Sequence, residues 1–332
     1  MRFPHLLLLL AVLLPAAAAA APAGYGRHAE ARAFAREMVE RHGFVAHELE
    51  DLFARARRKD SILRAIRPRA DPGVRSWRVY RDRFVNDTRL AGGRDFHARH
   101  AAALQRAERE HGVPSDIIVA IIGVETLYGR MTGTFRVIDA LSTLAFDYPP
   151  RAAFFRSELE HYLLFARDAG LDVFSVKGSY AGAIGIPQFM PGSYRRYAVD
   201  FDGDGATDLR ANPVDAIGSV ANFLREHGWR RDEAVWLPAR VTGNGHHALL
   251  EAGVEPSIRR STLSSHGVEA PEGLGEDTPV ALIEFVTPSA PTEYRLALRN
   301  FYVLTRYNRS SFYAAAVADL AAALRAARDQ AR

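Results

Sequence analysis

The N-terminal part of the chain shows a helical pattern of apolar residues. Between about residues 26 and 112, apolar positions recur three and four residues apart, most clearly in HAEARAFAREMVERHGF (28–44) and FHARHAAALQRAEREHGV (96–113). Gly43 and Gly112 follow these runs and are expected to end the helices, because glycine readily adopts the left-handed conformation found at helix ends. Pro72 and Gly73 predict a loop before a short aromatic segment.

The rest of the chain combines further helices with a small β region. From Pro114 to about Trp229 the pattern is mainly helical, interrupted by two Gly-rich stretches at 177–194 and 200–213. Short runs of strand formers between about 235 and 304, such as PVALIEFV, predict a small β subdomain. A last helix is expected in SSFYAAAVADLAAALRAAR (310–328), with Ser310 or Ser311 as its cap. The fold class is therefore mainly α, of the α+β type.

The first residues have the pattern of an export signal. Arg2 precedes an apolar run, Pro15 interrupts it, and an alanine tract at 16–21 offers cleavage sites, so residues 1–21 are expected to be a cleaved secretory signal peptide. A retained anchor helix is the alternative, but the run is short for a membrane span. The predicted location is the periplasm. The chain has no cysteine and hence no disulfide and no lipid-attachment residue, so no stable membrane anchor is expected.

The charge of the chain favours a polyanionic partner. The formal net charge is +4 and the pI is near 9.4, with arginines spread along the chain rather than gathered in a basic block. Because no nucleic-acid-binding module is recognisable either, nucleic acid is not expected as a partner.

A single acid, Glu125, follows one of the most apolar segments. Ser115 is a good N-cap for a helix at 116–128, which Gly129 would end, and residues 117–124 are apolar on every side. Glu125 would then lie in the last turn, where apolar neighbours and the negative end of the helix dipole both raise the pKa of a carboxyl group. A carboxylic acid kept protonated near neutral pH can serve as a general acid in glycoside cleavage. The alternative is a glutamate that reaches solvent or pairs with Arg130.

Aromatic and amide side chains lie in or near the Gly-rich and loop segments. Such residues suit a saccharide cleft, because sugar rings stack on aromatic faces while hydroxyl and acetamido groups need fixed donors and acceptors. Each residue has a plainer alternative: an aromatic ring is more often part of the core, and an amide can bond its own loop. The candidates for substrate binding are Tyr80, Ser179, Gln188, Phe189, Tyr307, Asn308 and Tyr313.

The segment DFDGDGATDLRA resembles a calcium loop in its spacing. Asp200, Asp202 and Asp204 occupy positions 1, 3 and 5, Gly205 allows the sharp turn at position 6, and Ala206 is at position 7, where such loops use a backbone carbonyl. Position 12 holds an alanine instead of the usual glutamate. We expect a structural Ca²⁺ site, with a metal-free acidic turn as the alternative. His246 and His247 lack partner ligands and are expected in a surface loop.

Long segments, in order, resemble the family 3 lytic transglycosylases. The resemblance spans about residues 31–324 and rests on IIVAIIGVETLYGR, VIDALSTLAFDYPPRAAFFRSELEHYLLFAR, KGSYAGAIGIPQFMPGSYRRYAVDFDGDG, PVDAIGSVANFLREHGW and NFYVLTRYNRSSFYAAAV. It implies a lysozyme-like core that carries the active site. The domains expected on this basis are a helical domain at 22–112, the catalytic core with the calcium loop at 113–234, the β subdomain at 235–304, and a C-terminal helix at 305–332 that returns to the helical and core region.

The resemblance also implies roles for particular residues. Glu125 matches the single catalytic acid, Ser179 is expected to orient substrate or assist the intermediate, and Asp215 matches the acid that completes the divergent calcium loop. The implied reaction cleaves the bond between MurNAc and GlcNAc in peptidoglycan and forms 1,6-anhydroMurNAc ends without a catalytic cofactor. A hydrolytic muramidase and a non-catalytic glycan-binding scaffold remain the alternatives. Peptidoglycan is the implied partner, and enzymes of cell-wall synthesis are further candidates.

Overall fold

The computed structural model describes residues 24–67 and 76–330, so the predicted signal peptide at 1–21 lies outside the described residues. The chain forms two compact units. The first ends at Arg58, and the second begins at Lys59. In the described part of the first unit, a short 3₁₀ turn (η1, Tyr25–Arg27) precedes the helices α1 (Ala29–His42) and α2 (Ala46–Arg55). The rings of Phe34 and Phe53 meet edge to face at 5.9 Å. Gly43 ends α1 with a φ of 66°, as predicted.

The second unit is mainly helical. Among the helices, β1 (Phe135–Arg136) and β2 (Lys177–Gly178) pair to form a two-stranded antiparallel ribbon. The helices are α3 (Asp60–Ile66), α4 (Trp77–Asp82), α5 (Asp87–Arg99), α6 (Ala101–His111), α7 (Ser115–Thr126), α8 (Val137–Asp147), α9 (Ala152–Asp168), α10 (Pro191–Tyr197), α11 (Pro213–Glu226), α12 (His247–Leu250), α13 (Arg299–Tyr307) and α14 (Ser311–Asp329), with 3₁₀ turns η2 (Pro149–Arg151), η3 (Arg260–Thr262) and η4 (Ser264–His266). Gly112 ends α6, as predicted.

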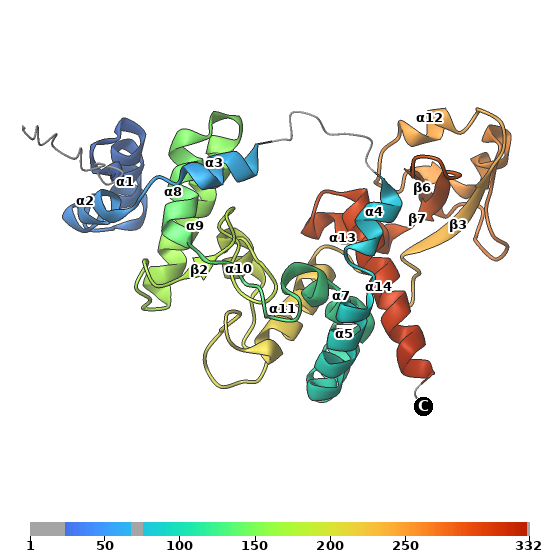
Figure 1. The fold of residues 1–332 in the computed structure, drawn as a ribbon, viewed down its shortest axis with the longest axis horizontal. Helices are drawn as coiled ribbons and strands as arrows, with labels where there is room; N and C mark the ends of the chain where they lie inside the picture. The colour runs from blue at the N-terminus through green and yellow to red at the C-terminus, as the bar shows by residue number, and fades with distance from the viewer. Residues whose placement is uncertain (1–23, 68–75, 331–332) are drawn as a thin grey trace, which may run out of the picture. The chain divides into compact units, whose positions relative to one another are not determined.

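Helix α7 lies at the centre of this unit. Its apolar sequence is buried on nearly all sides, and α5, α6, α11 and α14 pack against it (Figure 1). The helix is shorter than predicted. Ser115 is its first residue rather than its cap, and it ends at Thr126 because Leu127 and Tyr128 take left-handed conformations, with φ values of 50° and 63°.

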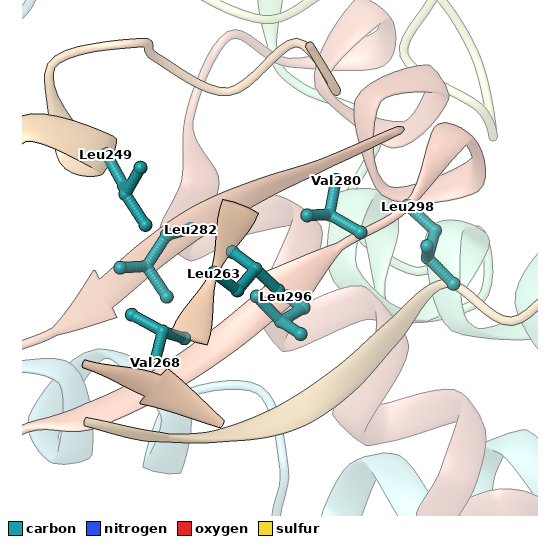
Figure 2. Packing of buried hydrophobic residues seen from close by; sticks show 7 residues of the cluster. All are labelled: Leu249, Leu263, Val268, Val280, Leu282, Leu296 and Leu298. Atoms are coloured by element: carbon teal, nitrogen blue, oxygen red, sulfur yellow. The ribbon is translucent and has the colours of Figure 1, made fainter. Parts of the chain in front are cut away.

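The predicted β subdomain is a five-stranded antiparallel sheet in the order β4-β6-β7-β3-β5. The strands are β3 (Trp236–Val241), β4 (Ile258–Arg259), β5 (Val268–Glu269), β6 (Pro279–Phe285) and β7 (Glu293–Ala297). Leu282 and Leu237 flank Leu296 on the neighbouring strands. Figure 2 shows the small core of this subdomain, formed by Leu249, Leu263, Val268, Val280, Leu282, Leu296 and Leu298.

After the sheet, α13 and α14 return the chain to α7. Ser310 caps α14 by accepting a hydrogen bond from the backbone N–H of Tyr313, which decides between the two caps predicted for this helix. Helix α14 then packs along α7 and α5 (Figure 1). None of the helices in the described ranges combines the length and the apolar character that crossing a membrane requires.

Candidate active site

Glu125 lies near the end of α7 with its carboxyl group in contact with α14. Its Oε1 accepts a hydrogen bond of 2.6 Å from the Tyr313 hydroxyl. Burial raises the pKa of Glu125 from 4.5 to about 7, and the hydrogen bond from Tyr313 opposes part of this rise. Within the described chain Glu125 forms no ion pair, so the alternative pairing with Arg130 is not found. The carboxyl group can therefore hold a proton near neutral pH.

The end of α7 is fixed by contacts that the sequence motif does not reveal. The hydroxyl of Thr126, buried next to Glu125, donates a hydrogen bond of 2.7 Å to the backbone oxygen of Ile186. Tyr128 folds back over the helix, and its hydroxyl donates to the backbone oxygen of Arg89 at 2.7 Å. A Cβ atom at Gly123 would lie 2.6 Å from the hydroxyl oxygen of Tyr128, so a larger residue here would force the Tyr128 ring to move. These contacts orient the last turn, which carries Glu125.

Two stacked tyrosines form the wall beside Glu125. The rings of Tyr307 and Tyr313 are 6.3 Å apart and inclined by 12°. Burial raises the pKa of both hydroxyls well above 10, so both keep their protons and act as hydrogen-bond donors. Tyr307 donates to the backbone oxygen of Pro187 at 2.5 Å, which joins α13 to the Gly-rich loop at 177–190. The two tyrosines thus connect the acid to this loop.

The Gly-rich loop presents Ser179 and Gln188. The Ser179 hydroxyl oxygen accepts hydrogen bonds from the backbone N–H groups of Ala181 and Ala183, which leaves its proton available for a further acceptor. Gln188 has a φ of 52°, and its Nε2 donates to the backbone oxygens of Thr132 and Gly185. The amide nitrogen therefore bonds its own surroundings, as the plainer alternative had it. Its Oε1 accepts no hydrogen bond from the described residues.

The other predicted contact residues differ in how accessible they are. Phe189 is 2% exposed, with its ring 5.8 Å from that of Tyr307, and Tyr313 is equally buried, so contact of either ring with substrate stays a prediction. Tyr80 on α4 is half-buried, with its ring 5.5 Å from that of Phe312, and it contributes to the raised pKa of Tyr313. Asn308 is exposed at the end of α13. Tyr80 and Asn308 thus approach the tyrosine wall from two different elements.

No second acid of the described residues acts on the pKa of Glu125. Burial raises this pKa, the Tyr313 hydrogen bond lowers it, and no acidic residue of the described chain contributes. Another buried acid, Glu158 on α9, also has a pKa raised by burial, but its Oε2 accepts from the backbone N–H of Gly192, far along the chain from α7. A cavity of about 830 Å³ lies at the opposite end of α7, near Asp116, and none of the residues discussed above lines it. The chemistry of the site therefore centres on one carboxyl group.

The acidic loop brings together three of its predicted ligands. Carboxylate oxygens of Asp200, Asp202 and Asp204 lie within 4.8 Å of one another, largely exposed. The prediction that Asp215 completes this group stays a prediction, because Asp215 is not one of the three clustered carboxylates. Asp215 is fully buried, and its two oxygens accept hydrogen bonds of 2.8 Å from the backbone N–H groups of Phe201 and Asp208. It supports the loop from inside.

The remaining loop residues can be placed in the same way. Ala206 donates its N–H to Asp204. Its carbonyl is the group that position 7 of a calcium loop supplies. His246 was expected at the surface but is 5% exposed, with its Nε2 3.2 Å from the Tyr294 hydroxyl. No cluster of metal-ligand side chains other than the three aspartates is found among the described residues.

Comparisons with known proteins agree on one family. The model of the transglycosylase SLT domain matches residues 26–322. The chain is 41% identical over 315 residues to the membrane-bound lytic murein transglycosylase B of Escherichia coli strain K12, covering 92% of this chain and 85% of that protein. The crystal structure of the soluble lytic transglycosylase SltB1 of Pseudomonas aeruginosa has a TM-score of 0.85 at 48% identity, covering 90% of this chain and 99% of that one.

A third relative has been crystallised with a metal ion. The Escherichia coli lytic transglycosylase Slt35, in complex with calcium, has a TM-score of 0.83 at 40% identity, covering 93% of this chain and 96% of that one. Together the matches confirm the predicted mainly α fold with a lysozyme-like core and the predicted enzyme class. The chain belongs to the transglycosylase SLT domain family, and its activity is that of a lytic transglycosylase that cleaves peptidoglycan.

Proposed function

We propose that Glu125 alone acts as both the acid and the base of this reaction. As the acid, it gives its proton to the glycosidic oxygen between MurNAc and GlcNAc, and the bond from C1 to that oxygen breaks. The acetamido group of the substrate stabilises C1. Glu125, now a carboxylate, takes the proton of the C6 hydroxyl of MurNAc, whose oxygen bonds to C1 and forms the 1,6-anhydro ring. Water is not consumed, and Glu125 regains its proton.

The observation that carries this proposal is the pKa of Glu125, raised by burial to about 7. A group with this pKa is well matched to giving and taking a proton near neutral pH. Glycosidases with two carboxyl groups place them about 5–10 Å apart, yet among residues 24–67 and 76–330 no other acid contributes to the pKa of Glu125. A single-acid mechanism needs no such partner. This supports the transglycosylase route over a hydrolytic muramidase that uses two acids.

The surrounding residues would bind the glycan. Tyr313 orients the carboxyl group through its hydrogen bond and lowers its pKa from the value that burial alone would give. Ser179 has a free hydroxyl proton to donate to substrate, and Gln188 offers its Oε1 as an acceptor. Tyr80, Tyr307 and Asn308 complete the cleft. The part of Phe189 is to support Tyr307.

We also infer that the acidic loop holds a structural Ca²⁺. Its three clustered carboxylates are the hard oxygen donors that calcium prefers, and the carbonyl of Ala206 at position 7 would add a fourth. Glycines at positions 4 and 6 have positive φ values of 79° and 89°, which the tight turn requires. With Asp215 bonded to backbone N–H groups, water would fill the remaining positions. The two charges of the bound ion would offset most of the three neighbouring negative charges and hold the loop in one conformation.

The proposed site of action is the cell wall in the periplasm, after export and removal of residues 1–21. The net charge of +4, which falls by one when Arg2 is removed with the signal, favours adsorption to the anionic wall polymer. Peptidoglycan strands are the proposed partner, and enzymes of wall synthesis are candidates for protein partners.

The test of the acid assignment compares two buried glutamates. Glu125→Gln should lose activity on purified peptidoglycan by at least about a thousandfold, because the general acid and base is removed. Glu158→Gln is the matched control, since Glu158 is also buried with a raised pKa but contacts the backbone of α10. It should retain activity. Full activity of Glu125→Gln would refute the assignment.

A further inference from the structure

A network of charged side chains, buried at its centre and exposed at its ends, joins α4, β7 and α14. Its centre is Asp319, in the middle of α14 and 8% exposed. The Nε of Arg81 on α4 donates to Asp319 Oδ2 at 2.7 Å. Arg295 on β7, only 3% exposed, donates to both oxygens of Asp319, at 2.7 and 3.1 Å. One carboxylate thus binds two arginines from two other elements.

The network of contacts continues from Arg295 through Glu293 back to α4, so that the linked side chains form a closed ring. Arg295 Nε donates to Glu293 Oε1 at 2.5 Å, and the indole N–H of Trp77 donates to Glu293 Oε2 at 3.1 Å. The guanidinium of Arg295 also lies 3.9 Å from the ring centroid of Trp236. Because Trp77 and Arg81 belong to the same helix, the ring fixes α4 against both the sheet and α14.

The two helices joined by this ring carry two cleft tyrosines. Tyr80 is next to Arg81 in sequence, and Tyr313 precedes Asp319 on α14. Helix α4 has six residues, too few to hold itself in place without tertiary contacts. Whatever fixes Arg81 relative to Asp319 therefore also fixes Tyr80 relative to Tyr313.

We propose that Asp319 is a positioning residue for glycan binding, acting through Arg81 on Tyr80. Buried ion pairs contribute little net stability but define one geometry, and here that geometry sets the position of Tyr80 relative to Tyr313, which is 2% exposed and holds the Glu125 carboxyl group. The inference rests on the proposed function, in which Tyr80 contacts the glycan. Asp319 itself does not touch the substrate.

The primary test is the Asp319→Asn variant, which keeps the shape of the side chain and removes its charge. We expect the KM for a soluble MurNAc–GlcNAc oligosaccharide to rise about tenfold, with a smaller change in kcat, because misplacement of a contact residue by about an ångström is costly. The matched control is Asp116→Asn. Asp116 is 3% exposed and binds Arg325 and Arg328 of the same helix α14, but at its far end. The Asp116→Asn variant should lose stability as Asp319→Asn does, but its KM should stay unchanged.

A double-mutant cycle separates positioning from general stability. In the Tyr80→Leu background, adding Asp319→Asn should raise the KM no further, because the positioned ring is already absent. Should Asp319→Asn not fold, Arg81→Gln takes its place, since Arg81 is 38% exposed and its loss is tolerated more easily. The inference would be overturned if the folded Asp319→Asn variant kept its KM. It would also be overturned if the fold-changes in KM of Asp319→Asn and Tyr80→Leu simply multiplied in the double variant. Activity of Glu125→Gln would instead overturn the proposed function.

Discussion

The raised pKa of Glu125 predicts that this residue destabilises the folded protein at alkaline pH. The unfolded chain releases the Glu125 proton at an ordinary pKa of 4.5, whereas the folded protein holds it until about pH 7. Each pKa unit corresponds to about 1.4 kcal/mol, so this difference corresponds to about 3 kcal/mol. The favourable contribution is complete below pH 4.5, decreases between pH 4.5 and 7, and is lost above pH 7.

Glu125→Gln should remove this dependence, because glutamine stays neutral and can still accept the Tyr313 hydrogen bond. Urea unfolding of the wild type and the variant at pH 4.5, 6, 7.5 and 8.5 gives the difference in unfolding free energy at each pH. The variant should gain up to about 3 kcal/mol relative to the wild type from the lowest to the highest pH. Other titrating groups largely cancel in this difference. A difference that stays constant with pH would refute the argument that burial keeps Glu125 protonated.

Three further predictions concern the contacts around the site and the acidic loop. Tyr313→Phe removes the hydrogen bond that lowers the pKa of Glu125, so the alkaline limb of the kcat/KM profile should move to higher pH; a move to lower pH would contradict this. Thr126→Val leaves the backbone oxygen of Ile186 without its buried donor and should cost about 1–3 kcal/mol by urea unfolding, together with part of kcat; unchanged stability would count against the contact. Added Ca²⁺ should raise the Tm of the wild type by a few degrees but not that of Asp200→Asn, and equal shifts would argue against the loop as the binding site.

The sequence predicted the apolar environment of Glu125 but not the side chain that hydrogen-bonds to its carboxyl group. The apolar run before it correctly indicated a buried helix end and a raised pKa, because burial follows from composition within a few turns. Tyr313, 188 residues further along the chain, donates the hydrogen bond that opposes the rise. No local pattern contains such a contact.

Contacts between distant residues, which no local pattern contains, also decide the positions of side chains in the loops. The family resemblance made Asp215 a candidate ligand, and the local sequence showed no sign that its two oxygens accept hydrogen bonds from backbone N–H groups of the loop. Phe189 lies in a Gly-rich loop that faces the site, yet its ring turns inward, and one residue before it Gln188 takes a left-handed conformation. The direction of a side chain in such a loop depends on positive φ values at particular residues. Composition alone does not determine where these occur.

Element types were predicted more reliably than element ends. The helices before Gly43 and Gly112 end where the glycines stand, because a left-handed residue follows each one. Helix α7 ends before Gly129, since Leu127 and Tyr128 adopt the same conformation under the constraint of tertiary contacts such as the Tyr128 hydroxyl on Arg89. Tertiary packing outweighed local preference at this point.

The central claim is that the C6 hydroxyl of MurNAc, deprotonated by Glu125, attacks C1 in place of water. It is tested most directly by measuring whether oxygen from water enters the product. Purified peptidoglycan is digested in water enriched in the heavy oxygen isotope, and the released muropeptides are analysed by mass spectrometry. The account predicts anhydro ends, each one water lighter than a reducing end, that carry no heavy oxygen. Reducing ends that carry the heavy isotope would show that water attacks C1 and would contradict the proposed mechanism.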